Sequence, residues 1–310
     1  MLVLTLSACA GGAPSPTARM DGSPPLPSAV DASASAPTPL ESTAPFTTAS
    51  ALGGATGWIA YQAGSTVDRQ AERIRIVRPD GTDDHELFGE IPYVKHLHPA
   101  WSPDGTTIVA RFDGGPMTDR GPTQLGLALI DVASGDYELI TLQGTEYQDI
   151  YPRWSPDGRQ LVFWREQTGP DGEQVAVFVM DMDDTEARQL TPWELRAGDP
   201  DWSPDGSWIV FGTHPLRGHE DGTWPSNLYL IRPDGTDMTQ LTDFGEGDDR
   251  ATHPRWSPDG RAILYARVGS VGHPREIWAM SADGSQDSIA VPPVAGRLYT
   301  HPAMQPTAGH

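Results

Sequence analysis

The sequence is poor in cysteine and in basic residues, and both shortages limit what the protein can do. Cys9 is the single cysteine among 310 residues, so no intrachain disulfide can form. Lys and Arg number 21 against 42 Asp and Glu, which leaves a formal net charge of −21. Because nucleic-acid binding needs basic side chains that displace counterions from phosphates, this composition argues against it. Beyond the N-terminus, no apolar run is long enough to cross a bilayer.

The short motifs of the common enzyme classes are missing as well. The chain has no Gly-x-Ser-x-Gly elbow, no His-Glu-x-x-His pair, no phosphate-binding glycine loop and no cysteine cluster that could hold zinc. We therefore expect no catalytic residue, no bound metal and no cofactor.

What the sequence does contain is one pentapeptide repeated in tandem. The letters WSPDG occur four times, beginning at Trp101, Trp154, Trp202 and Trp256, at intervals of 53, 48 and 54 residues. A period of this length indicates one supersecondary unit copied along the chain. Each copy follows an x-Pro pair and precedes a short apolar segment, a variable polar loop, a second apolar segment and a last short strand. The pattern predicts four short antiparallel strands per unit, bounded by turn residues.

The chemistry of Ser-Pro-Asp-Gly explains the repeated letters. Proline presets φ for the second turn position, aspartate bonds to nearby backbone, and glycine accepts a positive φ without steric cost. The motif therefore predicts a tight hairpin between the first two strands of each unit. We expect the four tryptophans to be structural residues that pack between neighbouring units.

The two ends of the repeated region complement each other. Residues 57–88 provide the second, third and fourth strands of a unit, and the C-terminal letters THPAMQP match a first strand, with Met304 at the tryptophan position. We expect the C-terminal strand to pair into the N-terminal blade and close a ring, which removes exposed sheet edges. The count is five blades.

At this point the tandem HPxWSPDG pattern resembles the β-propeller repeat of TolB and related WD-repeat-like proteins, over residues 57–310. The resemblance implies an all-β propeller of four-stranded blades, of which six are usual in that family against the five counted in this chain. Together with the missing enzyme motifs, it leads us to expect an extracytoplasmic scaffold that binds other molecules without catalysis.

The N-terminal region predicts export and anchoring. Leu6 to Cys9 resemble the lipobox of bacterial lipoproteins, so we expect residues 1–9 to be the remnant of a signal peptide and Cys9 to be lipidated. Residues 10–55 are mostly Ala, Pro, Ser, Thr and Gly, which predicts a disordered tether. Residues 56–310 then form the propeller. We expect a monomer at the cell envelope, attached to the membrane through the lipid alone, with an envelope protein or peptide as partner.

Two groups of residues are candidates for binding. The first group stands before the proline of each first strand, where a propeller lines its central channel, and forms a predicted ligand site at the channel mouth: His98, Tyr151, Asp199, His253 and His301. The second group lies in loops expected on the same face, which include residues 112–124 and 165–174: Tyr147, Trp193, His214, His219, Trp224, His273 and Tyr299. These loop side chains could instead pack only against their own loops. A second alternative is a hydrolase or metal-dependent enzyme centred on the channel, since Asp199 and Asp201 lie on one predicted channel strand.

Overall fold

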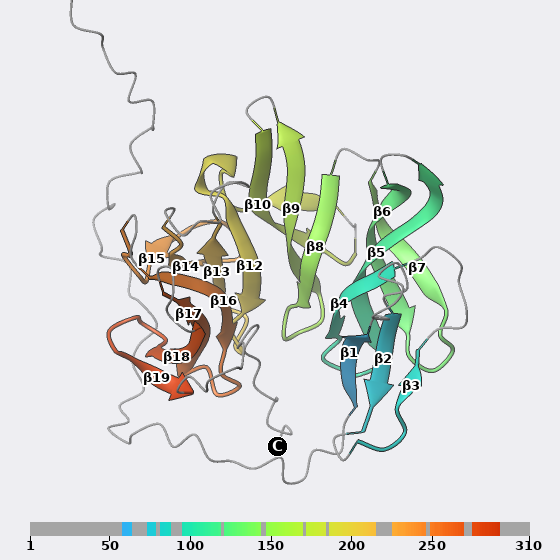
Figure 1. Cartoon of the computed structure of the whole chain (residues 1–310), viewed down its shortest axis with the longest axis horizontal. Coiled ribbons are helices and arrows are strands. Elements are labelled where there is room, and N and C mark those ends of the chain that lie inside the picture. The colour runs from blue at the N-terminus through green and yellow to red at the C-terminus, as the bar shows by residue number, and fades with distance from the viewer. Residues whose placement is uncertain are drawn as a thin grey trace, which may run out of the picture. The chain divides into compact units, whose positions relative to one another are not determined.

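The computed structural model describes residues 58–63, 73–78, 81–87, 95–118, 121–143, 147–169, 172–183, 186–214, 225–245, 249–269 and 275–291, all within the unit Ala36–His310. In these segments the strands form five antiparallel sheets, and the sole helical element is a short 3-10 turn, η1 (Trp193–Leu195). The sheets are the blades of a β-propeller (Figure 1), which confirms the predicted all-β fold and the count of five. None of the described residues belongs to a helix long and apolar enough to cross a membrane.

The blades follow one another along the chain. Blade 1 consists of β1 (Ile59–Ala63), β2 (Arg73–Val77) and β3 (His85–Glu86). Blade 2 consists of β4 (Lys95–Trp101), β5 (Thr107–Thr118), β6 (Gly121–Asp131) and β7 (Tyr137–Gln143). Blade 3 consists of β8 (Tyr147–Trp154), β9 (Gln160–Gly169), β10 (Gly172–Asp181) and β11 (Ala187–Gln189). Blade 4 consists of β12 (Ala197–Trp202), β13 (Ile209–Thr213), β14 (Leu228–Ile231) and β15 (Thr239–Gln240). Blade 5 is β16 (Arg250–Trp256), β17 (Ala262–Val268), β18 (Arg275–Ser281), β19 (Asp287–Val291).

Within each blade, neighbouring strands in the sheet are neighbours in the sequence. The first strands β4, β8, β12 and β16 contact the preceding or following blade and face the centre of the array in Figure 1. The predicted closing strand, with His301 and Met304, lies outside the described residues. Ring closure therefore stays a prediction.

The four WSPDG turns share one hydrogen-bonding scheme. In the first, Ser102 Oγ donates to Asp104 Oδ1 at 2.6 Å, and the backbone N–H groups of Thr106 and Thr107 donate to Asp104 Oδ1 and Ser102 Oγ. Gly105 has a φ of 73°, a left-handed conformation that costs free energy in a residue with a side chain but not in glycine. The same bonds recur in the other three turns, so this repeat is dictated by local turn chemistry.

The repeat also joins one blade to the next. The α-carbon face of Gly158 lies against Pro103 of the preceding turn, and Gly206 and Gly260 lie in the same way against Pro156 and Pro204. Identical turns can therefore stack around the array, which explains why the letters change so little from unit to unit.

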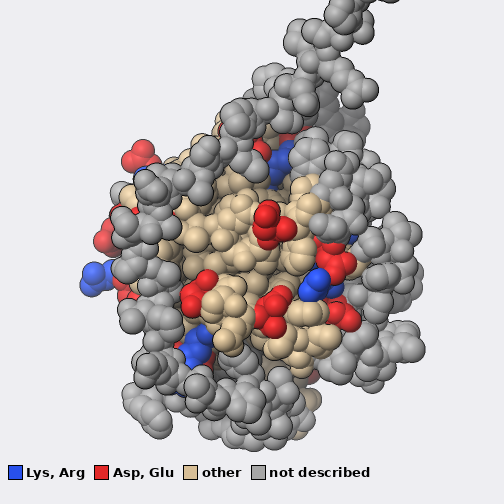
Figure 2. Space-filling model, turned by 90° about the vertical axis from the view of Figure 1, so that its left-hand side faces the viewer, with Lys and Arg blue, Asp and Glu red and all other residues tan. Residues whose placement is uncertain are grey.

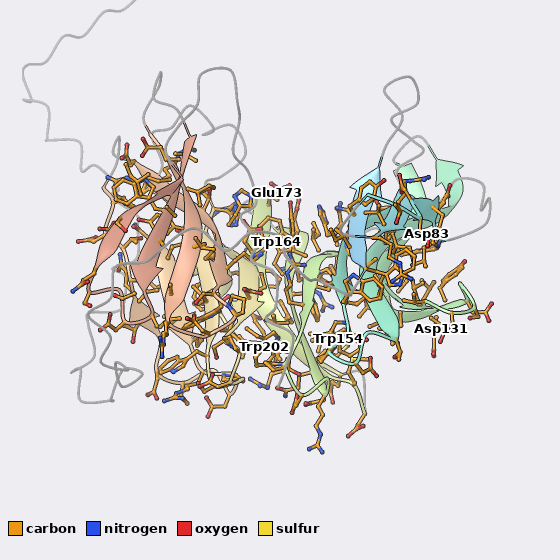
Figure 3. The ribbon with its side chains drawn as sticks, turned by 90° about the horizontal axis from the view of Figure 1, so that it is seen from below. Asp83, Asp131, Trp154, Trp164, Glu173 and Trp202 are labelled. Carbon is orange, nitrogen blue, oxygen red and sulfur yellow. The ribbon has the colours of Figure 1, made fainter. Side chains whose placement is uncertain are left out.

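Each repeat tryptophan packs in a core shared by two blades. Trp202 lies with Val162 and Val177 of blade 3 and with Ile209 and Phe211 of its own blade, and it is 6% exposed. Trp101, Trp154 and Trp256 occupy the corresponding positions at the other described junctions. Figure 3 shows Trp154 and Trp202 at the hairpin end of the strands. An aromatic side chain of this size contributes at most about 5 kcal/mol through apolar burial.

The second and third strands of blades 2 and 3 are longer than expected. Irregular loops were predicted at residues 112–124 and 165–174, but β5 reaches Thr118 and β9 reaches Gly169, so this prediction was wrong. Polar side chains continue the ladder: Gln167 Nε2 donates to Gln174 Oε1 across the β9–β10 pair at 2.8 Å. The hydrophobic pattern ends before the hydrogen-bonded pairing does.

Candidate functional site

The same backbone irregularity occurs on every described first strand. The residue before the proline has a positive φ of 52–55°, and the register with the second strand shifts at this point, as in a β-bulge; the four residues are His98, Tyr151, Asp199 and His253. Proline cannot donate to the ladder, which favours a bulge. A left-handed conformation costs a non-glycine residue on the order of 1–2 kcal/mol, although His and Asp tolerate it better than most. Each first strand thus carries local strain at one equivalent position.

These bulges contribute to a chain of touching rings. The His98 and Tyr151 rings, from adjacent blades, are stacked with centroids 3.8 Å apart and an interplanar angle of 20°. Tyr151 and Trp164 of β9 form a T-shaped pair with ring centroids 5.4 Å apart, and the centroids of Trp164 and His214 of blade 4 are 4.5 Å apart. The rings of blades 2, 3 and 4 are therefore in continuous contact.

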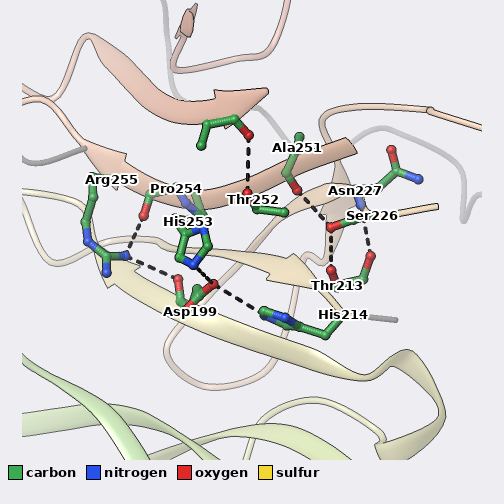
Figure 4. Close-up of polar contacts among 11 residues, drawn as sticks. Asp199, Thr213, His214, Ser226, Asn227, Ala251, Thr252, His253, Pro254 and Arg255 are labelled. Carbon is green, nitrogen blue, oxygen red and sulfur yellow. Dashed lines mark hydrogen bonds and ion pairs between the residues drawn. The ribbon is translucent and has the colours of Figure 1, made fainter. Parts of the chain in front are cut away.

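The chain of rings ends at a buried carboxylate held between two imidazoles. Asp199 is 1% exposed, and its Oδ2 lies 3.4 Å from His214 Nε2 and 3.5 Å from His253 Nε2 (Figure 4). His253 belongs to blade 5, so a carboxylate of blade 4 joins two blades. We call the six residues the mouth cluster: His98, Tyr151, Trp164, Asp199, His214 and His253.

Two features hold Trp164 and His214 in place. A β-carbon on Gly198 would lie 1.6 Å from Trp164 Cε3 and 2.8 Å from His214 Nε2, so glycine is needed for both rings to fit. The backbone N–H of His214 donates to the carbonyl of Arg196 at 2.9 Å, and Arg196 Nε donates back to the His214 carbonyl at 3.2 Å. Arg196 therefore fixes the point at which His214 leaves β13.

The structure places the predicted residues as follows. His98, Tyr151, Asp199 and His253 all belong to the mouth cluster, and His214 joins them from the predicted loop group. Trp193 packs against Phe178 at 5.6 Å between centroids, and the guanidinium of Arg165 lies 5.5 Å from the Tyr147 ring, so these two aromatics contact their own blade. The remaining candidates lie outside the described residues: His219, Trp224, His273, Tyr299 and His301.

Sequence reasoning missed Trp164. The residue comes from a second strand, β9, whereas only first strands and loops were considered (Figure 3). The signal that could have found it is Gly198, which stands where the other described first strands have Leu97, Ile150 and Thr252. A lone glycine in a strand often marks the close approach of another group.

Burial sets the protonation of two groups in the mouth cluster. Burial lowers the pKa of His214, with an opposing contribution from Asp199 and a further lowering from Arg196. Burial also raises the pKa of Tyr151 to about 12, reinforced by Asp199. At neutral pH the Tyr151 phenol therefore keeps its proton and the His214 imidazole is uncharged. No group of three or more His, Cys, Asp or Glu residues in the described segments is arranged to hold a metal ion.

The lowered pKa of His214 predicts a stability change in mild acid. Between the folded pKa and the ordinary histidine pKa of 6.5, the unfolded chain binds a proton that the folded chain does not, so the free energy of unfolding falls as pH falls through this window. We expect His214→Gln to lose less stability than the wild type between pH 7.5 and 5.5 in urea unfolding. Equal losses in both proteins would contradict this prediction.

A second layer of charged residues follows the prolines. Arg153, Asp201 and Arg255 occupy equivalent positions on β8, β12 and β16, where blade 2 has Ala100. Arg153 Nε lies 4.0 Å from Asp201 Oδ1, and the backbone N–H of Trp256 donates to Asp201 Oδ2 at 2.9 Å. Burial lowers the pKa of Arg153 to about 10 and raises that of Asp201.

The solved structures most like this chain include TolB proteins. TolB from Acinetobacter baumannii superposes with a TM-score of 0.58 at 20% identity, covering 76% of this chain and 53% of its own. The putative TolB from Agrobacterium tumefaciens gives a TM-score of 0.55 at 21% identity, covering 70% and 73%. An oligogalacturonate lyase in complex with manganese gives 0.51 at 17% identity, covering 70% and 58%.

Comparison with known sequences shows less similarity than comparison with solved structures. No protein-family model matches the chain. An uncharacterized peptidase of Bacillus subtilis, YuxL, is 28% identical over 164 residues, which are 52% of this chain and 21% of the peptidase. The chain thus spans about a fifth of that relative and about half of the A. baumannii TolB. Because the structural likenesses are below 25% identity, they concern the fold alone, and in fold this chain is a TolB-like β-propeller.

Proposed function

We propose that the protein is a non-enzymatic binding scaffold of the cell envelope that captures its partner or ligand at the mouth cluster. The observation that carries the proposal is the convergence of side chains from four blades on one place, with His98, Tyr151 and Trp164 in ring contact beside the buried Asp199. Binding sites commonly combine apolar and aromatic walls with a few fixed polar groups.

The composition of the cluster supports binding better than a purely structural role. Apolar packing stabilises a blade junction more readily than a buried carboxylate does, because taking a charge out of water is costly. The four strained bulges add a further cost, and strain of this kind concentrates at functional sites. A junction that served stability alone would favour neither feature.

Charge distribution and the N-terminus support the proposed location and partner. On the face shown in Figure 2, Asp and Glu side chains are scattered, and the Lys and Arg side chains visible there form no continuous basic surface of the kind that nucleic acids need. The lipobox-like Leu6–Cys9 sequence and the following tether fit lipid anchoring at the envelope. Comparing membrane partitioning of the wild type and Cys9→Ser tests this part; equal soluble fractions would contradict it.

A channel-centred enzyme is the second candidate. It is favoured by one observation: the Asp199 carboxylate lies within 3.5 Å of the imidazoles of both His214 and His253, and such groups can act in acid–base catalysis. The fold is shared with an oligogalacturonate lyase, and part of the sequence resembles a peptidase. Turnover of glycoside, uronide or peptide substrates that is lost in Asp199→Asn would favour this candidate over the scaffold.

Binding to an envelope extract of the source cell tests the leading proposal. We expect His98→Asn and Asp199→Asn to reduce the amount of captured partner at least about tenfold, because asparagine keeps the left-handed backbone but removes the ring or the charge. Tyr137→Ser is the control, since Tyr137 is 39% exposed and lies on β7, away from the mouth cluster. If all three variants capture the same partner as the wild type, the mouth cluster is not the binding site.

A further inference from the structure

The charged layer beneath the mouth cluster contains more positive than negative groups. Arg153 and Arg255 flank Asp201 on three consecutive first strands. Arg255 is 6% exposed and the Arg153 side chain is 22% exposed, so both guanidinium groups are largely withdrawn from solvent. A buried charge normally has a close counter-charge.

Asp201 supplies this counter-charge incompletely. One of its oxygens accepts the Trp256 N–H, and the other lies 4.0 Å from Arg153 Nε, the limit of an ion pair. In the part of the chain that the structure describes, Arg255 forms no ion pair with a carboxylate. Its Nη1 instead donates to the carbonyls of Pro254 at 2.7 Å and Asp199 at 3.5 Å (Figure 4).

Most guanidinium N–H groups of the two arginines are therefore unused within the described segments. Arg153 forms one hydrogen bond, from Nη1 to the Pro152 carbonyl at 2.9 Å. The fully buried nitrogens that lack a partner include Trp154 Nε1 and Trp256 Nε1 but no guanidinium nitrogen. Because the Arg153 side chain is 22% exposed, part of it borders space that solvent, or a ligand, can reach.

The pKa directions agree with this geometry. Burial and, to a smaller degree, the charge of Arg255 lower the pKa of Arg153 to about 10, so the two guanidinium groups disfavour each other. Burial raises the pKa of Asp201, although the charges of Arg255 and Arg153 act to lower it. An additional anion between the arginines would offset the repulsion between the two guanidinium groups and would favour the charged form of Arg153.

We propose that Arg153 and Arg255 hold the carboxylate group of a ligand that enters past the mouth cluster. The inference rests on the proposed function and specifies the chemistry of its ligand. A guanidinium group presents paired donors that match a planar carboxylate. The nearby Asp199 and Asp201 would repel a doubly charged phosphate more strongly than a singly charged carboxylate.

The mouth cluster indicates what accompanies this carboxylate. Tyr151 and Trp164 of the mouth cluster are aromatic and only partly buried, which suits contact with an aromatic side chain or a sugar ring. Two sources fit this shared chemistry: the free carboxyl terminus of a peptide and an acidic sugar. In both cases the ring contacts the mouth cluster and the carboxylate reaches the arginines.

Matched pairs of small ligands test the proposal on the full chain by calorimetric titration. The pairs are N-acetylphenylalanine with its amide, for a peptide terminus, and glucuronate with glucose, for a sugar. We expect at least one acid to bind with Kd no weaker than about 1 mM, and its neutral counterpart to bind at least about tenfold more weakly. The pair that responds identifies the source of the carboxylate.

Arginine variants complete the test. Arg153→Gln and Arg255→Lys should remove most of the preference for the acid, whereas Arg159→Gln and Arg261→Gln, which alter exposed arginines six residues further along the same two blades, should keep it. Retained preference in both inner variants, equal affinity for acid and neutral ligand, or no binding by either acid would overturn the proposal. If the mouth variants still lose the envelope partner in these cases, only the carboxylate inference fails and the proposed function stands.

Discussion

Replacing Gly198 by alanine is expected to lower the free energy of unfolding by about 3 kcal/mol, an unusually large effect for one methyl group. The added carbon would lie 1.6 Å from Trp164 Cε3 and 2.2 Å from Cζ3, distances at which the atoms overlap. The Trp164 indole cannot move away from this carbon easily, because its ring contacts those of both Tyr151 and His214. Either Trp164 changes rotamer or blades 3 and 4 separate locally.

Gly212 offers a matched control, since it pairs with Gly198 across β12 and β13. A β-carbon there would find Leu228 at 3.7 Å and Pro254 at 3.8 Å, which are ordinary contacts. Gly212→Ala should therefore change stability by no more than about 0.5 kcal/mol. The double variant Gly198→Ala with Trp164→Ala should be more stable than the sum of its single changes predicts, and urea unfolding measures all four proteins. Equal stability of Gly198→Ala and Gly212→Ala would show that the ring is not held as described.

The architecture could be predicted because its determinants are local and repeated. Each Ser-Pro-Asp-Gly turn is specified by its own hydrogen bonds, such as Ser203 Oγ to Asp205 Oδ1 at 2.6 Å, and these need no information from other blades. Four copies of one such turn mark four units by their spacing, and the strand pattern of residues 57–88 adds the fifth blade to the count. The positions before the prolines were predictable for the same reason, since they recur in every unit.

The contacts within the mouth cluster could not be predicted, because they depend on how the units differ. Trp164 occupies a position where blades 4 and 5 have Gly212 and Ala266, and it fits only because the next blade has Gly198. His214 reaches Asp199 because Arg196 fixes its backbone. Such contacts join residues that are unique in the repeat, so no periodic signal reveals them.

The length of the β5–β6 and β9–β10 hairpins was unpredictable for another reason. Beyond Phe112 and Trp164 the strands carry few large apolar side chains, and hydrophobic alternation, the main sequence signal for a strand, stops. Backbone pairing continues because the side chains pair as well, as Gln167 does with Gln174. A prediction based on hydrophobic alternation therefore places the ends of these strands too early.

The second large effect is expected at Asp149, whose side chain is fully buried and bound by both ends of the Arg165 fork, at 2.7 Å from Nε and 2.9 Å from Nη2. Asp149→Ala would leave the guanidinium of Arg165, 13% exposed, without its counter-charge. Breaking a buried pair in this way costs about 3–5 kcal/mol, and we expect a loss of unfolding free energy in that range.

Blade 5 contains an ion pair that is more exposed than the Asp149–Arg165 pair, and comparing the two shows how burial changes the strength of such a pair. Asp249 and Arg267 form an ion pair of the same 2.7 Å length, but their side chains are 29% and 24% exposed, so Asp249→Ala should cost only about 1 kcal/mol. Similar losses in both variants would mean that burial does not govern the strength of these pairs. Because Asp149 lies two residues before Tyr151 and Arg165 directly follows Trp164, the pair also fixes the strand register that presents both rings. Asp149→Ala should therefore weaken partner binding in the fraction that stays folded, whereas Asp249→Ala, on another blade from both rings, should leave it unchanged.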